Sequence, residues 1–211
     1  NQNHSLIDLA SNDYLGLSQH PNVIKAAQTM MAECGVGAGG SRFITGSRPI
    51  HKELEESLAK WLDRERVLVF PSGFQANLAA VIALTSRNTP VIADRLVHHS
   101  LLVGVKASGA RLFRFSHNDL NDLEKKLKAL PEKKNQEERP LVITESIFSM
   151  EGTSPNINVM TKLCNQYGAR LLVDEAHALG IMGNQGKGLS YGFNSSITMI
   201  SGTFGKAFGG G

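Results

Sequence analysis

LLVDEAH, at residues 171–177, is the stretch that decides the fold. Its apolar residues 171–173 follow one another without alternation and lead directly into Asp174 and Glu175. A short apolar run without alternation is typical of a strand that is covered on both faces, as in parallel sheets. The stretch therefore predicts a buried strand at 170–173 that brings Asp174 to the edge of a sheet.

Similar apolar runs alternate with helical patterns along the rest of the chain. Strands are predicted at 67–70, 91–93, 111–115, 141–144, 170–173 and 197–201. Helices are predicted at 21–33, 50–62, 74–86, 99–108, 119–129 and 157–167, and Asn118 is expected to cap the fifth of them. This alternation predicts an α/β fold of three layers, a mostly parallel sheet with helices on both faces.

Composition and charge limit what the protein binds. The 211 residues carry a net charge of +3 with acids and bases mixed, unlike the clustered basic surface of a nucleic-acid-binding protein. No apolar run approaches the roughly 20 residues of a membrane helix, and no signal peptide is expected at the polar residues 1–4. Cys34 and Cys164 lie far apart, which favours a reduced cytoplasmic protein without a metal site.

Polar residues follow the predicted strands at their carboxyl ends, where parallel sheets bind ligands. They are Ser72 and Gly73, His98, Ser149, Asp174 and His177, and the segment from Thr203 to Lys206. Five separate segments that place polar groups on one edge are difficult to explain by packing alone. The sequence therefore predicts a binding site there.

Residues 201–209, SGTFGKAFG, place Lys206 in a loop of small residues after the last predicted strand. Glycines allow a planar ligand to approach the backbone closely, and a lysine sheltered from water can act as a nucleophile. An ordinary surface lysine beside a turn is the open alternative.

Asp174 and His177 suit the end of an aromatic ligand that lies opposite the end bound by Lys206. A carboxylate at a strand end can keep a pyridinium nitrogen protonated through a charge-assisted hydrogen bond worth about 1.5–3 kcal/mol. His177 could meet a ring hydroxyl. The open alternatives are a helix cap for Asp174 and a packed histidine for His177.

Ser72-Gly73-Phe74 opens a predicted helix whose free N–H groups suit a phosphate, although a plain serine cap is equally compatible. Thr203 could add a hydroxyl to the same phosphate. Of the adjacent His98 and His99, one could stack on a ring, and a structural role is the alternative.

Two nucleotide-binding patterns are excluded. Residues 174–177, DEAH, resemble a helicase acidic box, and Gly205-Lys206 resembles part of a phosphate-binding P-loop. A P-loop needs glycine six residues before the lysine and Ser or Thr after it. Those positions hold Ile200 and Ala207, and no Gly-Lys-Ser/Thr occurs upstream.

In combination, these segments resemble the α-oxoamine synthases, a family of fold-type I pyridoxal-phosphate (PLP) enzymes. The matching motifs are SNDYLGL at 11–17, GGSR at 39–42, ADRL at 93–96 with His98 and Ser100 after it, ESIFSMEG at 145–152, and SGTFGKAFG at 201–209. The resemblance spans nearly the whole chain. It implies an aspartate aminotransferase-type large domain.

The resemblance also implies a role for each candidate residue. Lys206 would form the Schiff base with PLP and act as general base, Asp174 would bind the ring nitrogen, His177 the ring hydroxyl, and His98 rather than His99 would stack on the ring. Ser149 would lie near the ring. Ser72, Gly73, Phe74 and Thr203 would bind the phosphate, and Asn12 and Ser41 the substrates. No metal is implied.

Within the family, residues 201–209 are most similar to the biotin-pathway branch, which condenses L-alanine with pimeloyl-CoA or a pimeloyl-carrier protein and releases CO2. The alternatives are branches that make 2-amino-3-ketobutyrate, 5-aminolevulinate, sphingoid bases or long-chain amino ketones, and a non-catalytic scaffold subunit. Family members are homodimers. They are also longer, so the chain is expected to be a fragment.

The domain organisation expected from the resemblance is a substrate-contacting segment at 1–20, from a truncated N-terminal region, followed by an incomplete PLP-binding domain at 21–211. A C-terminal domain, with the arginine that binds the amino acid carboxylate, is expected beyond Gly211. Little or no catalysis is expected from these 211 residues alone.

Overall fold

The computed structural model describes residues 7–131 and 139–210, and they form two compact units. The sheet unit comprises residues 38–203, and the terminal unit comprises the chain up to Gly37 together with the segment from Phe204 onward. The predicted boundary at residue 20 stays a prediction, and residues 1–6 and Gly211 lie outside the described residues.

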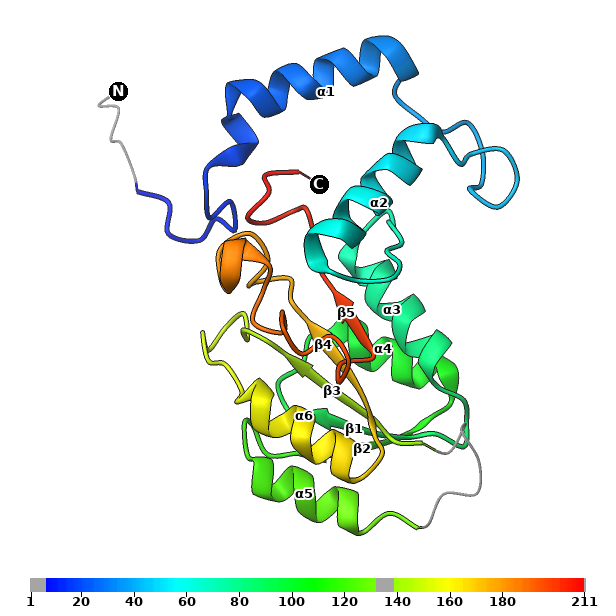
Figure 1. Ribbon diagram of the computed structural model, residues 1–211, viewed down its shortest axis with the longest axis vertical. Helices are drawn as coiled ribbons and strands as arrows, with labels where there is room; N and C mark the ends of the chain where they lie inside the picture. Colours follow the sequence, from blue (N-terminus) through cyan, green and yellow to red (C-terminus); the bar gives the residue numbers. More distant parts are fainter. Residues whose placement is uncertain (1–6, 132–138, 211) are drawn as a thin grey trace, which may run out of the picture. The chain divides into compact units, whose positions relative to one another are not determined.

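The sheet unit is built on five parallel strands (Figure 1). They are β1 (Pro90–Asp94), β2 (Arg111–Phe115), β3 (Leu141–Glu145), β4 (Arg170–Asp174) and β5 (Met199–Ser201), in the spatial order β2-β1-β3-β4-β5. Every neighbouring pair is parallel. The predicted parallel sheet is therefore confirmed.

Helices cover both faces of this sheet because its strands are apolar on both. Ile92 of β1 packs into a core with α5 (Leu120–Lys128) and α6 (Ile157–Gln166), whereas its neighbours Val91 and Ala93 pack into a core with α3 (Gly73–Leu84) and α4 (His99–Ser108). Adjacent residues of a strand point to opposite faces. The two cores thus confirm the predicted three layers.

The helices α3 and α4 pack closely. A Cβ atom added at Gly104 of α4 would lie 2.8 Å from the Cβ of Val81 on α3. Both residues are buried, so no space for a larger side chain exists at this crossing. This close packing fixes the start of each helix beside the carboxyl ends of the strands.

The predicted strand at 67–70 is wrong. These residues form no regular secondary structure, and the backbone of Val69 bonds to side chains instead of to a neighbouring strand. Its N–H donates to Glu55 Oε1 (2.8 Å), and its C=O accepts from Arg42 Nη1 (3.1 Å). Ser72 and Gly73 therefore follow a segment that is anchored to α2 (Pro49–Leu62) through Glu55, rather than a strand.

The predicted Asn118 cap is also wrong. Asp119 caps α5 and accepts hydrogen bonds from the N–H groups of Asn121 and Asp122. Asn118 has a left-handed backbone (φ 56°), and its N–H donates to Asp94 Oδ2. The other predicted helices and strands are confirmed, with small differences at their ends.

The terminal unit joins the two ends of the described chain. It contains a short 3-10 helix (Leu17–Gln19), the helix α1 (Pro21–Cys34) and the segment after Thr203. Gly209 has a left-handed backbone (φ 66°), and a Cβ added there would lie 2.2 Å from the backbone nitrogen of Ser18. Only glycine permits this approach.

Candidate functional site

The carboxyl ends of the strands bring three buried acids to one edge of the sheet. Asp94, Glu145 and Asp174 are the last residues of β1, β3 and β4 and are 0%, 3% and 5% exposed. The strand register places Glu145 beside Asp174, and Asp174 beside Ser201 of β5. This edge is where parallel sheets bind ligands.

Asp174 is held by neutral donors. Its Oδ2 accepts from Asn77 Nδ2 (2.7 Å), and its Oδ1 accepts from the N–H of Ala176 (2.9 Å). Asp174 therefore fixes a turn rather than capping a helix. Within residues 7–131 and 139–210 it takes part in no ion pair, so its charge is available to a cationic group of a ligand.

The N-terminus of α3 lies close to the end of β5. Ser72 caps this helix through a hydrogen bond from the N–H of Gln75 (3.2 Å), and the first-turn N–H groups of Gly73 and Phe74 have no partner within the helix. A Cβ added at Gly73 would lie 3.7 Å from Thr203 Oγ1. The structure thus brings all four predicted phosphate-binding residues together.

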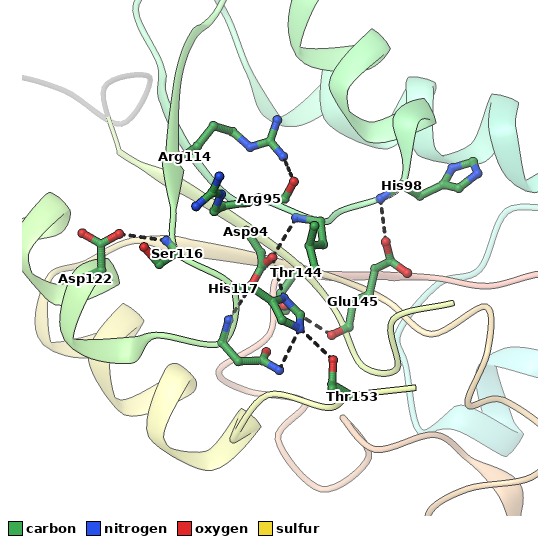
Figure 2. A network of polar contacts seen from close by, with 12 residues as sticks. Asp94, Arg95, His98, Arg114, Ser116, His117, Asp122, Thr144, Glu145 and Thr153 are labelled. Carbon is green, nitrogen blue, oxygen red and sulfur yellow. Dashed lines mark hydrogen bonds and ion pairs between the residues drawn. The ribbon is translucent and has the colours of Figure 1, made fainter. Parts of the chain in front are cut away.

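His98 lies at the N-terminus of α4. Its N–H donates to Glu145 Oε1 (2.5 Å), and its Nδ1 lies 2.7 Å from Ser100 Oγ. Figure 2 shows the imidazole extending away from Glu145 and from the side chains around Asp94. Because His98 is exposed, its ring is accessible to a ligand.

The remaining predicted residues of the sheet unit lie in turns and loops. His177 is half-buried in the turn after β4, and Ser149 is exposed in the turn after β3. Ser41 accepts hydrogen bonds in a loop before α2, where Phe43 N–H donates to its hydroxyl at 3.3 Å. The Arg42–Glu55 ion pair (2.6 Å) anchors this loop and lowers the pKa of Glu55.

Two predicted residues belong to the terminal unit. Lys206 is half-buried in a turn, and its C=O accepts from the N–H of Gly209 (2.9 Å). Asn12 is exposed and accepts from the hydroxyl of Tyr14 (3.2 Å). The approach of Gly209 to Ser18 holds the lysine loop against the segment that carries Asn12.

The sequence reasoning missed Asn77 and did not give Ser100 or Glu145 a role. Asn77 is buried on α3 and contacts Asp174 and Ser100. A signal for it exists, since Asn77 is the single polar side chain in the run from Ala76 to Leu84. An amide inside an apolar helix needs buried partners.

A second polar network, around Asp94, was also missed (Figure 2). Asp94 Oδ1 lies 2.9 Å from His117 Nδ1, and His117 Nε2 lies 2.7 Å from Thr153 Oγ1. The N–H groups of Leu96 and Asn118 also donate to Asp94. These contacts join the loops after β1, β2 and β3.

The residues at this edge of the sheet suit PLP. The uncompensated Asp174 suits a protonated ring nitrogen, and the helix N-terminus at Gly73, where a side chain would fill the space beside Thr203, suits a phosphate. In the described ranges no group of three or more His, Cys, Asp or Glu is placed to hold a metal ion. None of the described helices has the length and apolarity needed to cross a bilayer.

Comparisons with known proteins agree with this geometry. The chain matches the family "Aminotransferase class I and II" over residues 4–210. It is 42% identical over 202 residues to an 8-amino-7-oxononanoate synthase of Enterobacter sp. (strain 638), covering 96% of this chain and 51% of the relative. It is 39% identical over 199 residues to a serine palmitoyltransferase of Sphingobacterium spiritivorum, covering 93% and 49%.

Solved structures give the same result. A serine palmitoyltransferase of S. paucimobilis with PLP and myriocin bound superposes with a TM-score of 0.89 at 33% identity, over 94% of this chain and 50% of that one. An 8-amino-7-oxononanoate synthase of Francisella tularensis gives 0.77 at 29% identity, over 98% and 56%. The chain thus spans about half the length of its relatives. It belongs to the aminotransferase class I and II family, where its relatives are α-oxoamine synthases.

Proposed function

We propose that the full-length protein is a PLP-dependent acyltransferase that condenses L-alanine with pimeloyl-CoA, or a pimeloyl-carrier protein, and releases CO2 to give 8-amino-7-oxononanoate in biotin biosynthesis. The observation that carries the PLP assignment is Asp174. It is a buried carboxylate at a strand end, bonded to neutral donors, in the unit that also holds the Gly73 helix N-terminus. A pyridinium nitrogen and a phosphate are the groups that complement this pair.

The residues of the sheet unit would hold the cofactor. Asp174 would accept a hydrogen bond from the ring nitrogen, His98 would stack on the ring, His177 would donate to the ring hydroxyl, and Ser149 would lie near the ring. The phosphate is bound by the residues at the start of α3 and by Thr203, namely Ser72, Gly73, Phe74 and Thr203. Bound PLP supplies an aldehyde that reacts with amines and a ring that withdraws electrons from the adjacent carbon.

Lys206 would hold the cofactor covalently and then act as a base. Its amine would bind the cofactor aldehyde and, once freed from it, would take the proton from the substrate Cα. Asn12 and Ser41 would contact the substrates. Asp174 would stabilise the protonated ring nitrogen through its hydrogen bond.

The choice of L-alanine and a pimeloyl thioester is supported by the 42% identity to 8-amino-7-oxononanoate synthase. A second candidate is the condensation catalysed by another α-oxoamine synthase, because serine palmitoyltransferase is 39% identical over a similar span. Thiol release by the full-length protein, measured with L-alanine, L-serine and glycine against acyl-CoA donors of several lengths, separates the candidates. Turnover that requires L-serine and palmitoyl-CoA would favour the second.

Borohydride reduction tests the lysine assignment. The full-length protein is incubated with PLP, reduced and digested, and we expect the label on the peptide that contains Lys206. Lys206→Ala should abolish both labelling and turnover. Lys187→Ala is the matched control, because Lys187 lies at Tyr191 outside the proposed site and its loss should leave both unchanged. Label on another lysine would refute the assignment.

The full-length protein is also proposed to be a cytoplasmic homodimer. The loop before α2 exposes Phe43 (95%) and Ile44 (76%), which suits burial against a second copy. Light scattering of the full-length protein should give the dimer mass. A scaffold subunit without activity is disfavoured by the retained Lys206, and it would show no change in PLP absorbance with L-alanine.

A further inference from the structure

A chain of hydrogen bonds joins Asp174 to His98 through two buried side chains. Asn77 Nδ2 of α3 donates to Asp174 Oδ2 at 2.7 Å and to Ser100 Oγ at 3.0 Å. Ser100 Oγ of α4 lies 2.7 Å from His98 Nδ1. Asn77 and Ser100 are 4% and 0% exposed, so water does not compete for these bonds.

The chemistry of the groups fixes the direction of each bond. Asp174 as a carboxylate only accepts, so the amide of Asn77 must present its nitrogen rather than its oxygen. The same nitrogen donates to Ser100 Oγ, and the Ser100 hydroxyl proton is then directed to His98 Nδ1. The backbone N–H of Ser100 also donates to this nitrogen (3.3 Å). His98 Nδ1 is therefore an acceptor, and the ring proton lies on Nε2.

Stability alone does not explain an asparagine at position 77. Its Oδ1 is buried and, among the residues that the structure describes, has no hydrogen-bond partner. An unsatisfied buried carbonyl disfavours folding, and an apolar residue of similar size would remove that cost. An apolar residue at position 77 would, however, lose the two hydrogen bonds that the amide nitrogen donates to Asp174 and Ser100.

We propose that Asn77 and Ser100 are positioning residues that hold Asp174 in one orientation and His98 in its neutral Nε2–H form. The proposal rests on the proposed function, in which these two side chains contact the same cofactor ring. A protonated ring nitrogen is positive, so a neutral imidazole can stack on the ring without electrostatic repulsion. Through Asn77, α3 couples the orientation of Asp174 to its own N-terminus at Gly73, where the phosphate would bind.

The first test is the tautomer of His98 in the full-length protein without PLP. Nitrogen NMR of ¹⁵N-histidine-labelled protein, with the His98 signals identified by their loss in His98→Asn, should show an unprotonated Nδ1 and a protonated Nε2 at neutral pH. In Ser100→Ala the two tautomers should mix. A wild-type His98 with its proton on Nδ1 would overturn the proposal, and the tautomer itself is read from the wild-type protein.

The second test is PLP affinity. Asn77→Leu and Ser100→Ala should each raise the dissociation constant for PLP about tenfold, since each breaks a hydrogen bond to a residue that holds the ring. Thr161→Val is the matched control, because Thr161 is 3% exposed and its hydroxyl donates to Asn158 C=O on α6, outside the site. Its dissociation constant should not change.

Equal PLP affinity of wild type, Asn77→Leu and Ser100→Ala would refute the positioning role. Borohydride labelling of Lys206 in the same preparations keeps this result separate from the proposed function. If Lys206 is labelled while affinity and tautomer are unaffected, the enzyme assignment stands and only the positioning role fails.

Discussion

Asp94 and Asp174 end two strands of the same sheet, and both are buried, yet their surroundings differ. Asp94 accepts hydrogen bonds from the backbone N–H groups of Leu96 and Asn118 and contacts His117. Asp174 accepts one backbone N–H and the side-chain amide of Asn77. The contacts of Asp94 close loops onto each other, whereas those of Asp174 lead towards His98.

This comparison teaches that burial and position at a strand end do not identify a site carboxylate. Both aspartates meet those criteria. The difference lies in where the hydrogen bonds lead, because Asp94 is enclosed by its own loops, while Asp174 is connected to an exposed histidine through buried side chains. We therefore expect Asp94 to act on stability and Asp174 on activity.

The largest expected effect is that of Asp174→Asn on turnover by the full-length protein. The change removes the charge that would keep the ring nitrogen protonated, so kcat should fall by about a hundredfold or more. Steady-state assays measure it. The urea midpoint of the variant should shift less than that of Asp94→Asn, and a stable variant with wild-type kcat would break the comparison.

Asp94→Asn should have the reverse effect. An amide at position 94 cannot accept from all three of its present donors, so the free energy of unfolding should fall by about 1–3 kcal/mol. Urea unfolding followed by circular dichroism measures it. The kcat of the folded variant should stay within a few-fold of wild type, and a hundredfold loss of kcat at unchanged stability would contradict the assignment.

The reactivity of Cys164 offers an independent measure of the stability that Asp94→Asn loses. Burial raises the pKa of its thiol to about 12, so at pH 8 almost no thiolate is present in the folded protein and labelling requires opening of the core. A thiol reagent should label Cys164 about tenfold faster or more in Asp94→Asn than in Asp174→Asn. The partly exposed Cys34 is the internal reference, and equal Cys164 rates in the two variants would contradict the prediction.

The smallest expected effect is that of Thr153→Val. Thr153 is exposed, and its hydroxyl lies 2.7 Å from His117 Nε2, so its loss should cost about 0.5–1 kcal/mol. Thr153→Ser keeps the hydroxyl and should unfold at nearly the wild-type urea concentration. A cost for Thr153→Val equal to that of Asp94→Asn would show that the histidine, and not the aspartate, holds the three loops together.

Regular patterns made most of the fold predictable. Unbroken apolar runs such as 141–144 indicated buried strands, and Asp174 was correctly placed at the carboxyl end of its strand. Val69 could not be foreseen, because the side-chain partners that replace its strand neighbour come from Arg42 and Glu55. Asn118 was wrongly predicted as the cap because asparagine is favoured at that position. Its backbone is left-handed, and its N–H donates to Asp94 instead.

The positions of two candidate residues were predictable from local patterns, namely Asp174 at a strand end and Gly73 at a helix N-terminus. The supporting residues were not, since the pairing of Asn77 with Asp174 joins positions far apart in sequence. Only packing of α3 against α4 brings Asn77 next to Ser100. Such pairings depend on helix geometry that no local pattern encodes.

The approach of Gly209 to Ser18 has a consequence for the order of folding. The contact closes a loop from Ser18 to Gly209, so this part of the terminal unit cannot be completed before Gly209 has been synthesised. The strands of the sheet precede Gly209 in the chain and can pair earlier. During synthesis the amine of Lys206 therefore takes its folded position only after the sheet's own segments have left the ribosome.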